Sequence, residues 1–231
     1  GNYTSEVQAD TYIAGVSGSS AISYQQDGPP NTNMKSIYWN NQNPNFSHHT
    51  APSISLGQSG GAVNANMQPG LSSFKFYFLM KNINNPASVH YFFDYDMQQD
   101  PGTFNQGIQM FISTAGLFAP ASICVLMKDN TAQFGQYHAK LPSFAGFEDN
   151  KWHLYELIFD RTGPLPVYKV DGRSLTVINT FSGPALNTLT GISPTNGIRF
   201  GMREFSEADA SKSDTQMAAA AYSKNLSYTW K

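Results

Sequence analysis

Apolar and polar residues alternate with a period of two through much of the chain after residue 70. In residues 72–81, Phe74, Phe76 and Phe78 occupy alternate positions. Because successive side chains of a strand project to opposite faces, this spacing puts the three phenylalanines on one face. No long amphipathic helix is evident. The pattern therefore predicts an all-β protein.

Further segments with strand character follow at fairly regular intervals, separated by turn residues. They are residues 88–96, 106–113, 122–128, 132–141, 151–160, 196–205 and 218–230, with a hairpin over 167–178 whose Asp171-Gly172 pair suits a tight turn. Such regular spacing indicates a sandwich or barrel. Within 151–160, Trp152 is expected to pack in the core, and His153 to be packed or hydrogen-bonded. Trp230 is expected in the closing strand.

Residues 1–70 are harder to interpret because they are rich in turn-forming residues. One edge strand is expected around the KSIYW stretch, residues 35–39. No linker interrupts the apolar segments after residue 70. We therefore expect a single β-sandwich domain over residues 1–231, with an irregular, loop-rich N-terminal region over about 1–70.

Composition narrows the classes of function. Charged residues make up only 13% of the 231 residues and the net charge is −2, so the chain lacks the clustered lysines and arginines of nucleic-acid recognition. No segment approaches the roughly 20 apolar residues of a membrane span, so membrane insertion is not expected. The one cysteine, Cys124, lies in an apolar stretch and is expected to be a buried, unpaired thiol.

Two segments resemble known families. KWHLYELIFDRTGPLPVYKVDGRSL is similar to laminin-G-like and pentraxin-like modules, in which a "WH" strand meets a hairpin with a "DG" turn. FFDYDMQQDPGTFNQGIQMF, residues 92–111, is similar to the metal loop of legume-type lectins. These families share the concanavalin A-like jelly roll, and the resemblance covers roughly residues 72–230. It implies a concanavalin A-like β-sandwich of two antiparallel sheets.

The resemblance to legume-type lectins implies a metal site in part. Asp94 matches the first calcium-binding aspartate of that family, and Asp100-Pro101 matches its "DP" pair. Phe92 replaces the family's glutamate and Gln106 falls near its histidine, which removes the transition-metal half of the double site. What remains is at most one calcium site with the oxygen ligands Asp94, Asp96, Gln98 and Asp100. A plain polar turn is the alternative interpretation.

Catalysis is considered separately, since the same jelly roll carries hydrolases and lyases. No paired carboxylates suit a retaining glycoside hydrolase, and Asp94 with Asp96 is a weak candidate. The spacing of Tyr222, Lys224 and Tyr228 resembles that of alginate-lyase-type jelly rolls, and His90 loosely matches their histidine motif. No arginine precedes Arg161, so the early arginine-rich strand of that family is missing. The balance favours a protein that is not an enzyme.

Glycan binding remains the favoured function. Aromatic rings stack on sugar rings, while amides and single charges supply hydrogen bonds. The predicted contact residues are Tyr38, Trp39, Asn105 and Arg203. The expected protein is a lectin-like attachment module, extracellular or surface-exposed, whose partner is a glycan or glycoconjugate and not nucleic acid, with oligomerisation left open. The alternatives are a polysaccharide lyase or glycoside hydrolase, and a viral or surface spike or coat module that binds a protein receptor.

Overall fold

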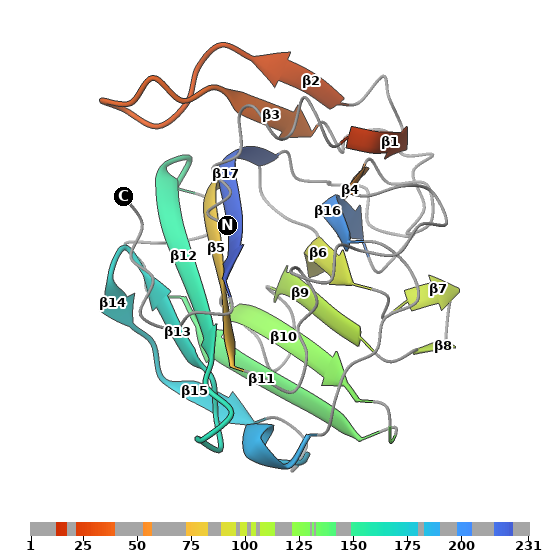
Figure 1. The fold of residues 1–231 in the computed structure, drawn as a ribbon. Coiled ribbons are helices and arrows are strands. Elements are labelled where there is room, and N and C mark those ends of the chain that lie inside the picture. Colours follow the sequence, from red (N-terminus) through yellow and green to blue (C-terminus); the bar gives the residue numbers. More distant parts are fainter. Residues whose placement is uncertain are drawn as a thin grey trace.

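The computed structural model of the chain is built almost entirely from β-strands (Figure 1). It describes residues 13–17, 22–39, 53–56, 73–82, 89–95, 98–100, 103–104, 107–113, 122–129, 131, 133–141, 149–179, 183–189, 198–204 and 215–223. Within these ranges the helical structure consists of one short 3-10 turn, η6 (Leu186–Thr188). No helix among them is long and apolar enough to cross a membrane. The prediction of an all-β protein is confirmed.

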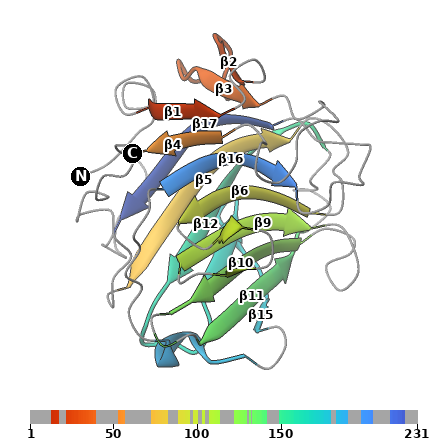
Figure 2. The ribbon, with the colours of Figure 1, turned by 90° about the vertical axis from the view of Figure 1, so that its right-hand side faces the viewer.

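The strands form two large antiparallel sheets. In spatial order, the eight-stranded sheet contains β1 (Ile13–Ser17), β4 (Ser53–Leu56), β16 (Ile198–Glu204), β6 (Val89–Tyr95), β9 (Gly107–Ser113), β10 (Ser122–Lys128), β11 (Phe134–Lys140) and β15 (Val177–Asn179). The seven-stranded sheet contains β14 (Arg173–Ser174), β13 (Val167–Val170), β12 (Trp152–Phe159), β5 (Phe74–Asn82), β17 (Thr215–Ser223), β3 (Ser36–Trp39) and β2 (Ile22–Gln25). Figure 2 shows the eight-stranded sheet face-on, with β5, β12 and β17 behind it.

Side-chain alternation explains why the two sheets pack together. Buried and partly exposed residues alternate along the whole of β12, and the predicted alternation in β5 places Phe76 and Phe78 in the hydrophobic core. The ring of Phe159 contacts those of Phe76 and Tyr168 edge-on, at centroid distances of 6.4 and 6.2 Å. The core cluster draws residues from both sheets, so it is the layer that holds the sandwich together.

Tyrosine hydroxyls also connect the two sheets. The Tyr168 hydroxyl, in β13, donates to the backbone oxygen of Tyr137 in β11 at 3.0 Å. The Tyr137 hydroxyl in turn donates to the carbonyl of Pro184 at 3.0 Å, and burial raises the pKa of Tyr137 to about 12. Both rings are fully buried, so each hydroxyl has a partner where water is absent.

The described parts of the N-terminal region contain strands. Four strands, β1 to β4, lie within residues 1–70, and they join both sheets. The expected edge strand at residues 35–39 is β3, but it pairs with β17 on one side and with β2 on the other. The prediction of an edge position is therefore wrong, because β2 adds outside β3 and forms the edge of the sheet.

The predicted tight turn between β13 and β14 is confirmed. Asp171 and Gly172 have φ angles of +50° and +77°, which is the left-handed backbone that such hairpin turns require. The expected burial of Cys124 is also confirmed, and burial raises the pKa of its thiol to about 12. The thiol accepts a weak hydrogen bond from the Gln136 amide at 3.4 Å.

Candidate functional site

The segment that resembles a lectin metal loop is divided among several strands. Asp94 lies in β6, with its Cα opposite Arg199 of β16 and Gln109 of β9. Gln98 and Asp100 lie in β7 (Gln98–Asp100), which, within the described ranges, pairs with β8 (Thr103–Phe104) in a two-stranded ribbon. Asp96 lies outside the described residues. The side chains of this predicted calcium set are not described, so the calcium site stays a prediction.

The predicted lyase residues are located in part. His90 lies in β6 of the eight-stranded sheet, opposite Glu204, whereas Tyr222 lies in β17 of the seven-stranded sheet, opposite Phe76. Lys224 and Tyr228 lie outside the described residues. The two residues that are located therefore belong to different sheets, and the structure does not bring them into one strand pair.

The predicted glycan contacts also fall in different places. Arg203 lies in β16, opposite Tyr91 of β6, and Asn105 lies outside the described residues. Tyr38 and Trp39 lie in β3 of the other sheet, and the Tyr38 side chain is partly exposed. Tyr38 is thus the member of the predicted set around which a site can be built.

Tyr38 belongs to a cross-strand row that runs over five strands of the seven-stranded sheet. We call this the Tyr38 row; its members, each directly opposite the next, are Ser23, Tyr38, Gln216, Lys81 and Trp152. Directly opposed residues of antiparallel strands share one face of a sheet. The core-facing residues of β5 and β12 are at the alternate positions, so the Tyr38 row lies on the outer face.

Trp152 forms one end of the row and corrects a prediction. The sequence suggests that Trp152 packs in the core, but it is partly exposed, and the buried neighbour is His153. The Lys81 ammonium lies over the Trp152 ring, 5.7 Å from its centroid. The prediction fails because alternation along a strand defines two faces without telling which of them is buried. Trp152 was assigned to the buried face and lies on the other.

A small hydrogen-bond network fixes Gln216, the residue of the row between Tyr38 and Lys81. Gln216 is 5% exposed, and its amide nitrogen donates to the Ser36 hydroxyl at 3.1 Å and to an Asp27 carboxylate oxygen at 3.3 Å. The Ser36 hydroxyl donates to the Asp27 carbonyl at 2.7 Å. These contacts fix the Gln216 amide next to Tyr38, and Asp27 itself is exposed.

A second, more charged row lies beside the first on the same face. Tyr77, Glu156 and Lys169 are directly opposite one another on β5, β12 and β13. Burial lowers the pKa of Lys75, two positions from Tyr77, while the nearby charge of Glu156 acts in the opposite direction. Glu156 therefore lies between two ammonium groups.

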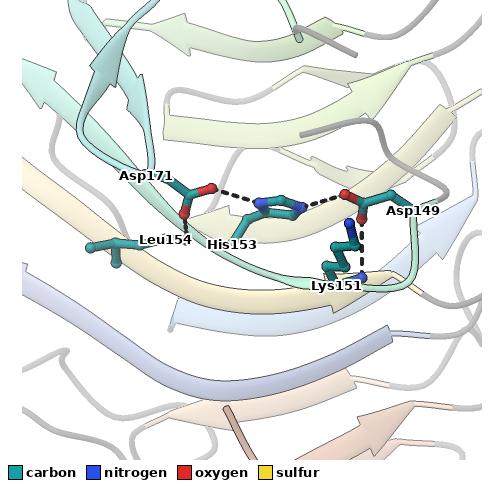
Figure 3. A network of polar contacts seen from close by, with 5 residues as sticks. All are labelled: Asp149, Lys151, His153, Leu154 and Asp171. Atoms are coloured by element: carbon teal, nitrogen blue, oxygen red, sulfur yellow. Dashed lines mark hydrogen bonds and ion pairs between the residues drawn. The ribbon is translucent and has the colours of Figure 1, made fainter. Parts of the chain in front are cut away.

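A buried histidine between two carboxylates lies just behind the Trp152 end (Figure 3). His153 Nδ1 is 2.7 Å from Asp171 Oδ2, and Nε2 is 2.9 Å from Asp149 Oδ2. The Leu154 backbone N–H donates to the other Asp171 oxygen, and the Lys151 N–H donates to the other Asp149 oxygen. Both ring nitrogens donate at once only in the imidazolium form.

This histidine cluster is a structural tie between three segments. The Asp171 N–H also donates to the Leu154 carbonyl at 2.9 Å, so the hairpin turn is attached to β12 by side chain and backbone together. The expectation that His153 is hydrogen-bonded is confirmed. The "WH" strand and the "DG" turn of the sequence pattern contain His153 and Asp171, so the pattern pointed to their contact. Nothing in the sequence marked Asp149 as the second partner of His153.

The charges of the cluster also reach Tyr155. This residue is fully buried, its ring meets that of His153 at 6.4 Å, and its hydroxyl has no hydrogen-bond partner among the described residues. Burial raises the pKa of Tyr155 far above its ordinary value, and the negative charges of Asp149 and Asp171 add to the effect. Burial and the two negative charges therefore both favour the neutral phenol.

Comparison with known proteins identifies the fold. No family model and no curated protein matches this sequence. In structure, the chain is similar to the receptor-binding domain of botulinum neurotoxin type G, with a TM-score of 0.55 and 11% identity over 96% of this chain and 42% of that one. The chain is also similar to a structure of botulinum neurotoxin type C, a toxin whose cell entry depends on interaction with two ganglioside molecules. That match has a TM-score of 0.54 and 15% identity, and it covers 88% of this chain and 42% of that one.

An enzyme appears among the similar structures as well. The alginate lyase from Alteromonas sp. 272 gives a TM-score of 0.50 and 9% identity, over 96% of this chain and 98% of that one. The chain spans less than half of the neurotoxin structures named above but nearly the whole lyase. At these identities the likeness concerns the fold alone. The chain is a β-sandwich jelly roll of two antiparallel sheets.

Proposed function

We propose that this protein binds carbohydrate, without catalysis, on the outer face of its seven-stranded sheet. The observation that carries the proposal is the Tyr38 row: two partly exposed aromatic residues, Tyr38 and Trp152, flank the polar residues Gln216 and Lys81. Aromatic faces stack on the apolar faces of sugar rings, and the partly exposed Lys81 ammonium between them supplies hydrogen bonds to hydroxyl groups.

The dimensions of the row suit an oligosaccharide. Three strand spacings of about 4.8 Å separate β3 from β12, which puts the backbones at Tyr38 and Trp152 about 14 Å apart. A sheet is also a rigid support, so the ordering cost of binding is smaller than for a site built on loops. The hydrogen bonds that fix Gln216 to Ser36 and Asp27 add to this preorganisation.

The neurotoxin structures support the proposal at the level of the fold. One of those toxins depends on gangliosides to enter cells, so this type of sandwich is compatible with glycoconjugate recognition. On this basis we assign the protein an attachment or recognition role outside the cell or on a surface. A calcium ion held by Asp94, Asp96, Gln98 and Asp100 stays part of the proposal, as a structural ion.

A glycan-array screen tests the proposal. The purified chain is screened with about 1 mM calcium, the level that extracellular sites of this kind require, and again with EDTA. We expect binding that falls at least about tenfold in Trp152→Ala and Tyr38→Ala, the usual cost of removing a stacking residue from a binding site. The matched control is Ile178→Ala, an exposed apolar residue of the eight-stranded sheet, which should bind as wild type.

Each outcome is informative. Loss of binding in EDTA, together with a calcium-dependent drop in thermal stability for Asp94→Ala, would establish the calcium site. Equal stability of that variant with and without chelator would remove it. Binding that is unchanged in both aromatic variants would contradict the Tyr38 row as the site, and no binding to any probe would favour a protein receptor.

The near-complete overlap with an alginate lyase makes a lyase the second candidate. Incubation with alginate should leave the absorbance near about 235 nm unchanged if the protein only binds, because unsaturated uronates form only when a base removes the proton next to the carboxylate. Growth of that absorbance, abolished by Tyr222→Phe, would replace the binding proposal with a lyase.

A further inference from the structure

We propose that the Trp152 end of the Tyr38 row selects sugars that carry a negative charge. The inference rests on the proposed function and deepens it, because it names the ligand class as acidic glycans, with a carboxylate or a sulfate group directed at Lys81. Three observations on this part of the outer face carry it.

The first observation is the position of Lys81. It is directly opposite Trp152, partly exposed, with its ammonium over the indole ring. The ion pairs of His153 with Asp149 and Asp171 do not involve Lys81. Within the described part of the chain, the charge of Lys81 is therefore balanced only by the quadrupole of the ring, which leaves its hydrogen-bonding capacity for a ligand.

The second observation is that the nearby carboxylates are already engaged. Asp149 accepts from His153 and from the Lys151 backbone N–H (Figure 3), so both of its oxygens have donors. Glu156 lies opposite Lys169 and is electrostatically coupled to Lys75. Neither of the two ion pairs of His153, with Asp149 and with Asp171, involves Lys81. The Lys81 ammonium is therefore the group at this end of the row that an anionic ligand would approach.

The third observation is the contrast between the two ends of the row. The Tyr38 end carries the exposed carboxylate of Asp27, hydrogen-bonded to Gln216, and it would repel an anionic sugar unit. The Trp152 end carries the Lys81 ammonium beside an aromatic face. An acidic sugar would therefore stack on Trp152 with its anionic group on Lys81, and the rest of the chain would run toward Tyr38.

Binding to charged and neutral polysaccharides tests this inference. The probes are polygalacturonate, dextran sulfate and neutral dextran, measured by isothermal titration calorimetry or surface-based binding at low salt. The variants are Lys81→Gln, Lys81→Arg, and the control Lys140→Gln, an exposed lysine of β11 in the other sheet. All three keep the strand residues long and polar, so folding is expected to be normal.

We expect wild type to prefer at least one charged probe over dextran, and Lys81→Gln to lose about fivefold to tenfold in affinity for it, as for one lost charge-assisted contact. Lys81→Arg should keep most of the affinity, and Lys140→Gln all of it. Binding should also weaken as sodium chloride increases, because salt screens exposed charges. Polygalacturonate and dextran sulfate distinguish a carboxylate from a sulfate ligand.

Two failures are distinguishable. If dextran binds as tightly as the charged probes and Lys81→Gln has no effect, the inference is overturned while glycan binding stands. If Lys140→Gln loses as much as Lys81→Gln, binding follows net charge and the inference is likewise overturned. If neither charged nor neutral probes bind, the proposed function fails and takes the inference with it.

Discussion

The two faces of β12 differ in what they contribute to the protein. Alternate residues from His153 to Phe159 are buried, whereas those from Trp152 to Ile158 are partly exposed. The buried face joins the core and the histidine cluster, and the exposed face contributes to the surface with the Tyr38 row. Because the two sets alternate along one strand, adjacent substitutions should separate stability from binding. The difference shows that a single strand can serve both purposes without conflict.

The largest effect is expected on the inner face, for Leu157→Ala. Leu157 has no exposed surface and belongs to the core cluster, so truncation should lower the free energy of unfolding by about 2–5 kcal/mol through lost burial and a cavity. Urea denaturation measures the change. The control is Ile158→Ala, the next residue, which is partly exposed and should cost much less. Equal losses in both variants would contradict the separation of the two faces.

A smaller effect is expected for His153→Gln. The substitution removes a ring that serves two carboxylates, and the glutamine amide can satisfy only one, so we expect a loss of about 1–2 kcal/mol, tempered because Asp171 is partly in water. Thermal unfolding measures it. Asp171→Asn tests the turn separately, since asparagine tolerates the left-handed backbone there while losing the charge. An unchanged midpoint for His153→Gln would show that the cluster is not a tie.

The smallest effect is expected for Tyr155→Phe. The Tyr155 hydroxyl is buried and without a hydrogen-bond partner among the described residues, so its removal takes away a desolvated polar group and leaves the ring contacts in place. We expect stability to stay within about 0.5 kcal/mol of wild type, or to rise, and glycan binding to be unchanged. A loss above about 1 kcal/mol, measured in the same denaturation assay, would indicate a partner for this hydroxyl.

Much of the fold could be predicted from local patterns. The period-two alternation identified β5 and β12 as strands with two distinct faces, and the Asp171-Gly172 pair identified a turn that needs two left-handed residues. The N-terminal strands were harder to predict. β2 and β3 are only four residues long. β3 is a strand because it pairs with β17, and the local sequence contains no information about that distant partner.

The candidate site was less predictable, because it depends on register between distant segments. Tyr38 was singled out by its type, but its row with Gln216 and Lys81 joins residues far apart in the chain. Trp152 was assigned to the core because a large aromatic residue is usually buried. When the outer face of a strand also packs or binds, both of its faces carry apolar residues. The alternation in the sequence then does not show which face points into the core.

The bulge in β17 has a consequence for the two faces of the seven-stranded sheet. The register shifts between Met217 and Ala219, so Thr215–Ser223 contains one residue more than the partner segment, residues 75–82. On one side of the bulge Gln216 is in step with Lys81, and on the other Tyr222 is in step with Phe76. A strand that accommodates one surplus residue in this way keeps the residues on both sides of the bulge on their proper faces, so the extra amino acid does not turn the Tyr38 row into the core.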